Sequence, residues 1–334
     1  MSRADAAAVI LWVGATFYAL FGGADFGGGL WDLIAGGAER GRRPRALIQR
    51  SLTPVWEANH VWLIFILVVL WTAFPPAFSA VMTTLYVPLA LAAVGIVLRG
   101  SGFAFRKSIE SLSGQRAAGA AFALSSVLTP FFMGAVVGAI AAGNVPAGGD
   151  GDAFSSWLEP LPLLVGAMFV ASSAYLAAVF LVGDARRTGE AELEAYFVRR
   201  ALAAAALAGA AAALGLVELH SEARYVFDRL LDQGLPLVVL SGLCGVGLLV
   251  VLLRGGRRPL RPLAAGAVVA VIWGWGVAQF PYLLPTSLKI AAAAAPDPTL
   301  DVIFVVFGAA AVLVLPALGL LYVLSQRELL GEGD

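Results

Sequence analysis

The amino-acid sequence predicts an all-α, polytopic membrane protein that crosses the bilayer with nine transmembrane helices. Of the 334 residues, 60% are hydrophobic and only 13% are charged, and the mean hydropathy is +0.86. Soluble domains average about 45–50% apolar and about 25% charged residues. Apolar runs long enough to cross a hydrocarbon core of about 30 Å recur along the chain. Residues 1–334 are therefore expected to form a single integral membrane domain with no soluble domain attached.

The apolar runs predict the limits of the nine spans. In chain order they are 6–35, 54–74, 77–99, 117–142, 160–183, 197–218, 234–254, 261–285 and 301–325. The first run is longer than a bilayer requires, so we expect its helix to continue beyond the membrane face. Thr53 and Pro54 suit the N-cap and first position of the second span. Pro75 and Pro76 predict a turn before the third, because neither helix could run through them.

The basic residues predict how the chain is oriented in the membrane. All but four of the 22 Lys and Arg residues fall in the 1–2, 3–4, 5–6 and 7–8 connections and at the C-terminus. The four on the opposite side are Arg3, Arg224, Arg229 and Lys289. Because positively charged residues remain in the cytoplasm, we expect an outside N-terminus and a cytoplasmic C-terminus. An odd number of spans requires the same arrangement.

The residue inventory predicts no metal or haem ligation by this chain. Haem in a helix bundle needs axial His, Met or Cys ligands that face the interior. The sequence has two histidines, of which His60 is in the second span and His220 is in an outer loop. The remaining candidates stand at scattered positions typical of core packing: Met82, Met133, Met168 and the single Cys244. The sequence also contains no Gly-rich phosphate loop, so it does not favour an ATP-driven activity.

The second span opens with a polar cluster, Trp56-Glu57-Ala58-Asn59-His60-Val61-Trp62. Ionisable groups at membrane depth cost a few kcal/mol each, so they favour a functional interpretation. Glu57 and His60 are three residues apart and share one helix face, while Asn59 projects to the side. A carboxyl group that is both buried and close to an imidazole could carry protons near neutral pH. Two structural alternatives stay open: Glu57 would suit the dipole of a first helical turn, and His60 could be a hydrogen-bonded packing residue.

A second candidate, Asp25, lies in the first span within Gly22-Gly23-Ala24-Asp25-Phe26-Gly27-Gly28-Gly29. Glycines remove side-chain bulk, so another helix backbone can approach closely. They also leave space through which water could reach the carboxyl group. Asp25 is therefore a candidate for proton transfer, and the alternative is a carboxyl group that bonds to a neighbouring helix for packing.

Two further elements carry polar or aromatic groups. The third span ends in Leu98-Arg99-Gly100-Ser101-Gly102-Phe103-Ala104-Phe105-Arg106. Arg99 and Arg106 are expected on the same side as Asp25 and Glu57, where they could pair with these acids or extend to lipid phosphates. The eighth span ends in Gln279-Phe280-Pro281-Tyr282-Leu283-Leu284-Pro285, whose prolines break a helix and whose aromatic rings suit a membrane interface.

These four elements, in this order, resemble subunit II of the cytochrome bd-type quinol oxidases, including the cyanide-insensitive variants. The resemblance covers nearly the whole chain. The helix-two signature of the family, Trp-[Asp/Glu]-x-Asn-x-Val-Trp, is met by Trp56 through Trp62. The Arg99–Arg106 and Phe280–Pro285 segments are similar to two further family motifs. One departure is that Gly22 stands where many members have the first acid of Asp-Gly-Phe-Asp, so Glu57 is expected to carry more of any proton traffic.

The resemblance implies a fold and a cellular context. It implies two four-helix bundles plus one extra helix, in the cytoplasmic (inner) membrane of a prokaryote. Haems b and d and the quinol are expected on subunit I, which pairs with this chain as a heterodimer. Small single-helix subunits, membrane lipids and a structural quinone or lipid are further expected partners, and nucleic acid is not. The chain is expected to be part of a quinol:oxygen oxidoreductase without being catalytic alone.

The resulting hypothesis is that Glu57, Asp25 and His60 form part of a cytoplasmic proton path towards subunit I. Asn59, Trp56, Trp62, Arg99 and Arg106 are the expected supporting residues. Two rivals stay open at this point. One is a proton-coupled secondary transporter, which would typically have broken helices near the midplane in both halves. The other is a purely structural subunit in which every carboxyl group serves packing.

Overall fold

The computed structural model describes residues 1–37, 39–106, 112–256 and 258–326. Within these helices, the side chains of 52–58, 60, 103–106, 112–118, 315, 318 and 321–326 are not described. The elements, in chain order, are α1 (Arg3–Leu33), α2 (Arg42–Ala73), α3 (Pro75–Thr84), α4 (Tyr86–Arg106), α5 (Leu112–Ala142), α6 (Pro160–Arg187), α7 (Ala191–Glu222), α8 (Arg224–Asp232), α9 (Leu235–Leu253), α10 (Leu260–Gln279), β1 (Tyr282–Leu284), β2 (Leu288–Lys289), α11 (Ile290–Ala293) and α12 (Asp297–Gln326).

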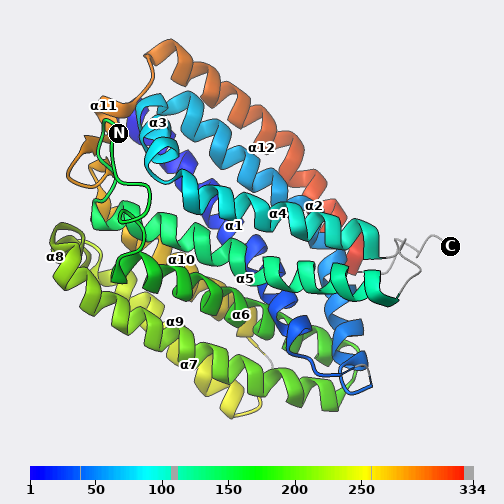
Figure 1. Ribbon diagram of the computed structural model, residues 1–334. Coiled ribbons are helices and arrows are strands. Elements are labelled where there is room, and N and C mark those ends of the chain that lie inside the picture. The colour runs from blue at the N-terminus through cyan, green and yellow to red at the C-terminus, as the bar shows by residue number, and fades with distance from the viewer. Residues whose placement is uncertain (38, 107–111, 257, 327–334) are drawn as a thin grey trace.

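The long helices confirm a polytopic, helical membrane protein. Seven helices in the described ranges are long and apolar enough to cross a membrane, and the bent pair Val61–Ala73 with Pro75–Thr84 would make an eighth. A shorter apolar helix covers Tyr86–Gly102. Figure 1 shows the long helices running in broadly one direction, with the start of α1 at one end of the molecule. Helix α6 packs extensively against α1, α5 and α7, so it lies at the centre of the bundle.

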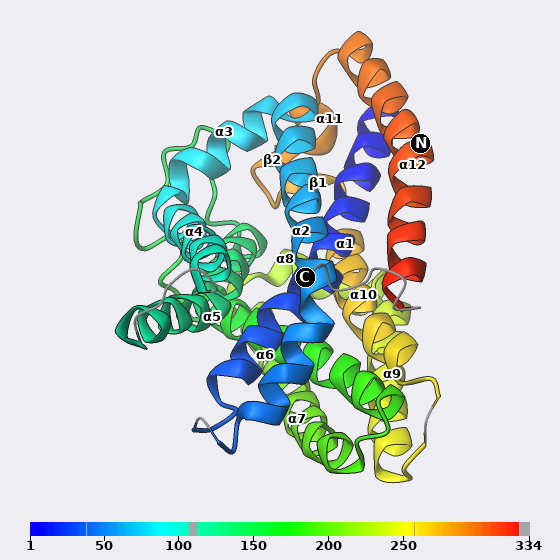
Figure 2. The same ribbon diagram turned by 90° about the vertical axis from the view of Figure 1, so that its right-hand side faces the viewer.

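The predicted turn at Pro75 is present, but the predicted helix over 77–99 is wrong. Helix α2 ends at Ala73 and α3 departs from it at 117°. The chain then breaks again at Leu85, which ends α3, and α4 begins at Tyr86. Pro88 accounts for this second break, because its ring would clash with the carbonyl group of Thr84 in a continuous helix. Figure 2 shows α3 at the upper left, slanting from the upper end of α2 towards α4.

The segment at the end of the eighth predicted span also holds elements that the sequence did not predict. The expected span 261–285 ends early: α10 stops at Gln279, and β1 and β2 form a short antiparallel hairpin. Pro281 restricts Phe280 to an extended conformation, which ends the helix. The side-chain nitrogen of Gln279 then donates to the carbonyl oxygen of Leu283 at 2.8 Å. The short amphipathic helix α8 was expected to be a loop.

Helix α1 joins the two main hydrophobic clusters of the protein. Its first half packs with α2, α3, α5 and the hairpin around Phe74, and its second half packs with α6, α7 and α10 around Phe197. Two indoles of α1 donate to backbone carbonyls of other helices: Trp12 to Ile272 at 3.0 Å and Trp31 to Ala174 at 2.8 Å. These bonds fix α1 against α10 and α6, so its polar residues have a defined place in the interior.

The glycines of α1 allow the close approach that the sequence predicted. A Cβ atom at Gly27 would lie 1.9 Å from the carbonyl oxygen of Ser173, which is backbone of α6. A Cβ atom at Gly29 would lie 2.0 Å from the hydroxyl oxygen of Ser126 in α5. Both distances are far below van der Waals contact. The absence of side chains at these two positions therefore sets the separation of α1 from α6 and α5.

Replacing Gly27 with Ala is expected to lower the free energy of unfolding by about 1–3 kcal/mol, the usual cost of overpacking a well-packed interior. The added methyl group would meet backbone of α6, which cannot rotate away. Gly23→Ala is the matched control, because its Cβ atom would meet the flexible side chain of Leu176 at 3.3 Å and would lie 3.7 Å or more from Ser173, an ordinary van der Waals distance. Thermal unfolding of the purified protein measures the difference. Equal melting temperatures for the two variants would contradict the proposed backbone contact.

Candidate functional site

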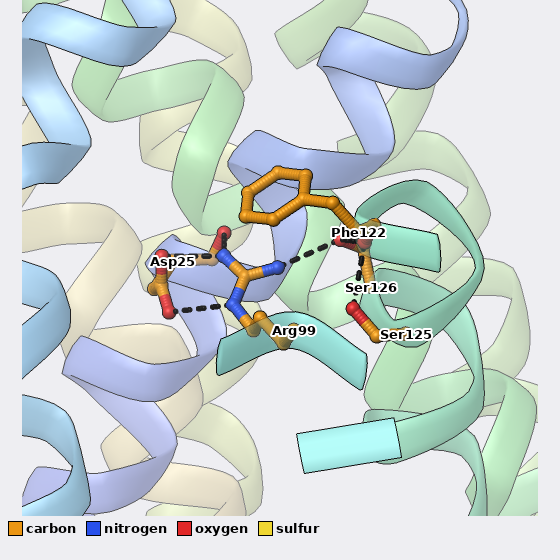
Figure 3. Close-up of polar contacts among 5 residues, drawn as sticks. All are labelled: Asp25, Arg99, Phe122, Ser125 and Ser126. Atoms are coloured by element: carbon orange, nitrogen blue, oxygen red, sulfur yellow. Dashed lines mark hydrogen bonds and ion pairs between the residues drawn. The ribbon is translucent and has the colours of Figure 1, made fainter. Parts of the chain in front are cut away.

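A buried ion pair between Asp25 of α1 and Arg99 of α4 forms the polar centre of the protein. The Arg99 side chain is 1% exposed and that of Asp25 is 4% exposed. Arg99 Nη2 donates to Asp25 Oδ1 at 2.5 Å, and Nε donates to Oδ2 at 3.1 Å. Nη2 also donates to the backbone oxygen of Asp25 at 2.9 Å. The guanidinium group thus holds the carboxylate in a two-pronged contact (Figure 3).

The remaining nitrogen of the guanidinium group, Nη1, points to α5. Nη1 donates to the hydroxyl oxygen of Ser126 at 2.7 Å, and Ser126 in turn donates to the backbone oxygen of Phe122 at 2.8 Å. The rings of Phe26 and Phe122 cover the cation, with their centroids 4.9 and 4.4 Å from its central carbon. Arg99 therefore links α1, α4 and α5 through charge, hydrogen bonds and cation–π contacts.

Next to the ion pair lies a small cavity of about 10 Å³, lined by Tyr18, Asp25, Phe26, Asn59, Leu63, Ile96 and Arg99. A cavity of this size has room for about one water molecule. Asn59 is 3% exposed, and neither its amide oxygen nor its amide nitrogen has a hydrogen-bond partner among the described residues. Buried polar groups are nearly always satisfied, so an orphaned amide at a cavity wall indicates a place for a hydrogen-bonding guest.

The structure brings together part of the residue set that the sequence predicted. Of the pairings considered for Arg99, the one with Asp25 is present. Asn59 of α2 joins the same centre through the cavity. Trp62 is buried and stacks on Phe17 of α1, with ring centroids 4.5 Å apart. The tryptophan thus belongs to the α1–α2 contact and does not line the cavity.

Four of the predicted residues fall outside the described side chains. Trp56, Glu57 and His60 are positions of α2, and Arg106 is the last residue of α4. The predicted N-cap at Thr53 and helix start at Pro54 are wrong, because α2 already begins at Arg42; Glu57 therefore lies well inside the helix and not in its first turn. The third span was predicted to end at residue 99, but α4 continues to Arg106. The roles assigned to these side chains stay predictions.

Sequence reasoning missed three contributors to the site: Tyr18, Phe122 and Ser126. Tyr18 precedes Asp25 by two helical turns, so the spacing alone puts both on one face of α1. Ser126 and its neighbour Ser125 form a polar pair inside an apolar helix, which was the available signal on α5. Phe122 carried no signal, because a phenylalanine in a membrane helix is ordinary until its ring is found over a cation.

Among the described residues, no group of three or more His, Cys, Asp or Glu side chains could hold a metal ion. His220 was predicted to lie in a loop, but it belongs to the last turn of α7, where it is exposed, next to Arg224, with its ring edge-on to Phe227. An exposed ring beside an arginine does not face the helix interior, where an axial haem ligand would have to stand.

The fold and the site together define a polytopic, helical membrane protein with a buried ion pair at the junction of α1, α4 and α5. The family model described as cytochrome bd terminal oxidase subunit II matches residues 4–325, so the chain belongs to that family. This confirms the resemblance that the four sequence elements indicated.

Two individual relatives match only part of this chain, each at 28% sequence identity. The cytochrome bd-I ubiquinol oxidase subunit 2 of Escherichia coli (strain K12) is 28% identical over 184 residues, which cover 53% of this chain and 47% of that protein. The cytochrome bd ubiquinol oxidase subunit 2 of Bacillus subtilis (strain 168) is 28% identical over 125 residues, which cover 37% and 35%. The matched regions therefore span about a third to a half of these relatives.

The fold is shared over the full length with a solved structure. In the structure of bd oxidase from Geobacillus thermodenitrificans, a chain matches this one with a TM-score of 0.78, at 24% sequence identity, and the match covers 100% of both chains. The likeness confirms the overall helical fold of the chain.

Proposed function

We propose that this chain is the non-haem-ligating subunit of a respiratory quinol:oxygen oxidoreductase. In this role it supports the haem-bearing subunit I and supplies part of the cytoplasmic proton path for the reduction of oxygen to water. Family membership over residues 4–325 supports the oxidase assignment. The observation that carries the proton-path proposal is the buried polar centre itself, in which Asp25, Arg99 and the orphaned amide of Asn59 surround a water-sized cavity.

The proposed path starts from the acidic residues near the cytoplasmic face. Glu57 and Asp25, with His60 as a further member, move protons inwards. Arg99 keeps the Asp25 carboxylate in place, and a water molecule between Asn59 and Asp25 would provide a hydrogen-bonded step. Ionisable groups this deep in a helix bundle are costly, which favours a functional role over packing alone. Because the matching position is Gly22, no second carboxyl group stands one turn before Asp25.

The haems would supply the electron chemistry when bound to subunit I: they pass electrons from quinol to oxygen, which consumes protons. This chain contributes support and protonation. We propose that nine helices cross the membrane, namely α1, α2, α4, α5, α6, α7, α9, α10 and α12, with the N-terminus outside. They would form two four-helix bundles plus one extra helix, as a single domain in the cytoplasmic membrane, beside lipids, small single-helix subunits or a structural quinone.

A reduced-minus-oxidised visible spectrum of the chain, tagged and purified gently from its native membrane, tests the proposed function. The proposal expects haem b and d bands together with a larger co-purifying chain, both lost when the chain is purified from cells that lack subunit I. A haem-free preparation without a partner would instead favour a proton-coupled transporter. Against a transporter, the one sharply bent helix pair found in the described ranges lies in the first half only, whereas transporters typically break helices in both halves.

A further inference from the structure

A second cavity lies where the end of α6 meets the start of α10, and it shares no lining residue with the cavity at the ion pair. Its volume is about 290 Å³, close to the lower limit of about 300 Å³ for ligand pockets. The lining residues are Val179, Gly183, Arg186, Arg258, Pro259, Leu260, Arg261 and Pro262. Three arginines from two separate segments thus surround one cavity, next to aliphatic side chains.

Carboxylates offset only part of this positive charge. Arg186 Nε pairs with Glu194 at 2.7 Å, and its Nη1 donates to the backbone oxygen of Gly256. Arg261 Nη2 pairs with Asp184 at 2.5 Å, but its buried Nε has no hydrogen-bond partner in the described part of the chain. Arg258 forms no ion pair with any described residue and is exposed. The cavity region therefore keeps the positive charge of Arg258 and the unpartnered Nε–H of Arg261, and Asp184 is shared between Arg261 and Arg187.

The first turn of α10 adds further donors at the same place. The helix begins at Leu260 after Pro259, and no side chain caps it. The first backbone N–H groups of a helix have no partner within that helix, and the helix dipole gives this end a partial positive charge. Because α10 is 20 residues long, its N-terminus suits an anion. Pro262 takes one donor away and leaves the amides of Leu260 and Arg261.

We propose that this cavity binds a phosphate group. A phosphate has several acceptor oxygens and suits arginine donors and helix N-termini alike. The position at the ends of two membrane helices, together with Val179 and Leu260 in the lining, favours the headgroup of an anionic phospholipid as its source. The sequence predicts this side to be cytoplasmic, and basic pockets between membrane helices on that side suit such headgroups. The bound lipid would connect α6 to α10.

Thermal-shift titration of the delipidated, purified complex tests the proposal, with phosphatidylglycerol, phosphatidylcholine and inorganic phosphate as separate probes. We expect phosphatidylglycerol to raise the melting temperature more than phosphatidylcholine. Arg258→Gln should raise the half-saturating phosphatidylglycerol concentration about tenfold, the effect of losing one charged hydrogen bond. Arg254→Gln is the matched control, because Arg254 is an exposed arginine at the end of α9 that does not line the cavity. Both variants change exposed residues and should fold.

The outcomes separate the possible sources. Equal loss in the two variants would show a general effect of surface charge and overturn the site. An unchanged titration in Arg258→Gln would overturn it as well. If inorganic phosphate saturates as tightly as the lipid and shows the same dependence on Arg258, the phosphate site stands and the lipid source is overturned.

Discussion

Replacing Arg99 with Gln is expected to lower the free energy of unfolding by about 3–5 kcal/mol, the usual cost of removing one partner of a buried ion pair. The Asp25 carboxylate is 4% exposed and would lose both of its hydrogen bonds to the guanidinium group. Ser126 would lose a charged donor, and the rings of Phe26 and Phe122 would lose the cation between them. We expect less assembled protein in the membrane and a lower melting temperature.

The double variant Asp25→Asn with Arg99→Gln separates the uncompensated charge from the loss of packing. With both charges of this pair removed, the double variant should be more stable than Arg99→Gln alone, because an unpaired buried charge is the larger cost. Arg99→Lys keeps the charge but not the planar fork, so it should fall between wild type and Arg99→Gln. If the loss of unfolding free energy in the double variant equals the sum of the losses in the two single variants, Asp25 and Arg99 are not coupled.

Much of the helical fold was predictable because each span must hold a long apolar run, and such runs are visible in the sequence. The positions at which helices break were harder to predict. Pro75 was recognised, but Pro88 was not, because its effect depends on whether the chain before it is already helical. The hairpin after Gln279 depends on the side-chain bond from Gln279 to Leu283, a contact that no local pattern predicts.

The candidate site was predictable only in part. Asp25 and Arg99 were both expected on one side of the membrane, which made their pairing one of several possibilities. That Ser126 would complete the contact depends on Gly29, since any side chain there would displace the Ser126 hydroxyl group. The orphaned amide of Asn59 results from how α1, α2 and α4 pack together. Such features arise from tertiary packing between residues far apart in the sequence.

The second large effect is expected at Glu57. Glu57→Gln keeps the size of the side chain and removes the group that gains and releases a proton. If Glu57 carries protons towards subunit I, oxygen reduction should slow by about a hundredfold, the lower end of what a positioned proton-transfer group contributes. Haem content should stay intact, because Glu57 is proposed to conduct protons and not to hold the assembly together. Glu39→Gln is the control, since Glu39 is an exposed residue of the loop between α1 and α2.

The most direct test of the proton path is oxygen consumption per haem d in purified, assembled enzyme that carries Glu57→Gln, measured beside wild type and Glu39→Gln. The account predicts wild-type haem spectra for all three proteins and slow turnover in Glu57→Gln alone. Wild-type turnover in fully assembled Glu57→Gln enzyme would contradict the claim that this chain conducts protons, and loss of turnover only in proportion to lost haem would assign Glu57 a purely structural role.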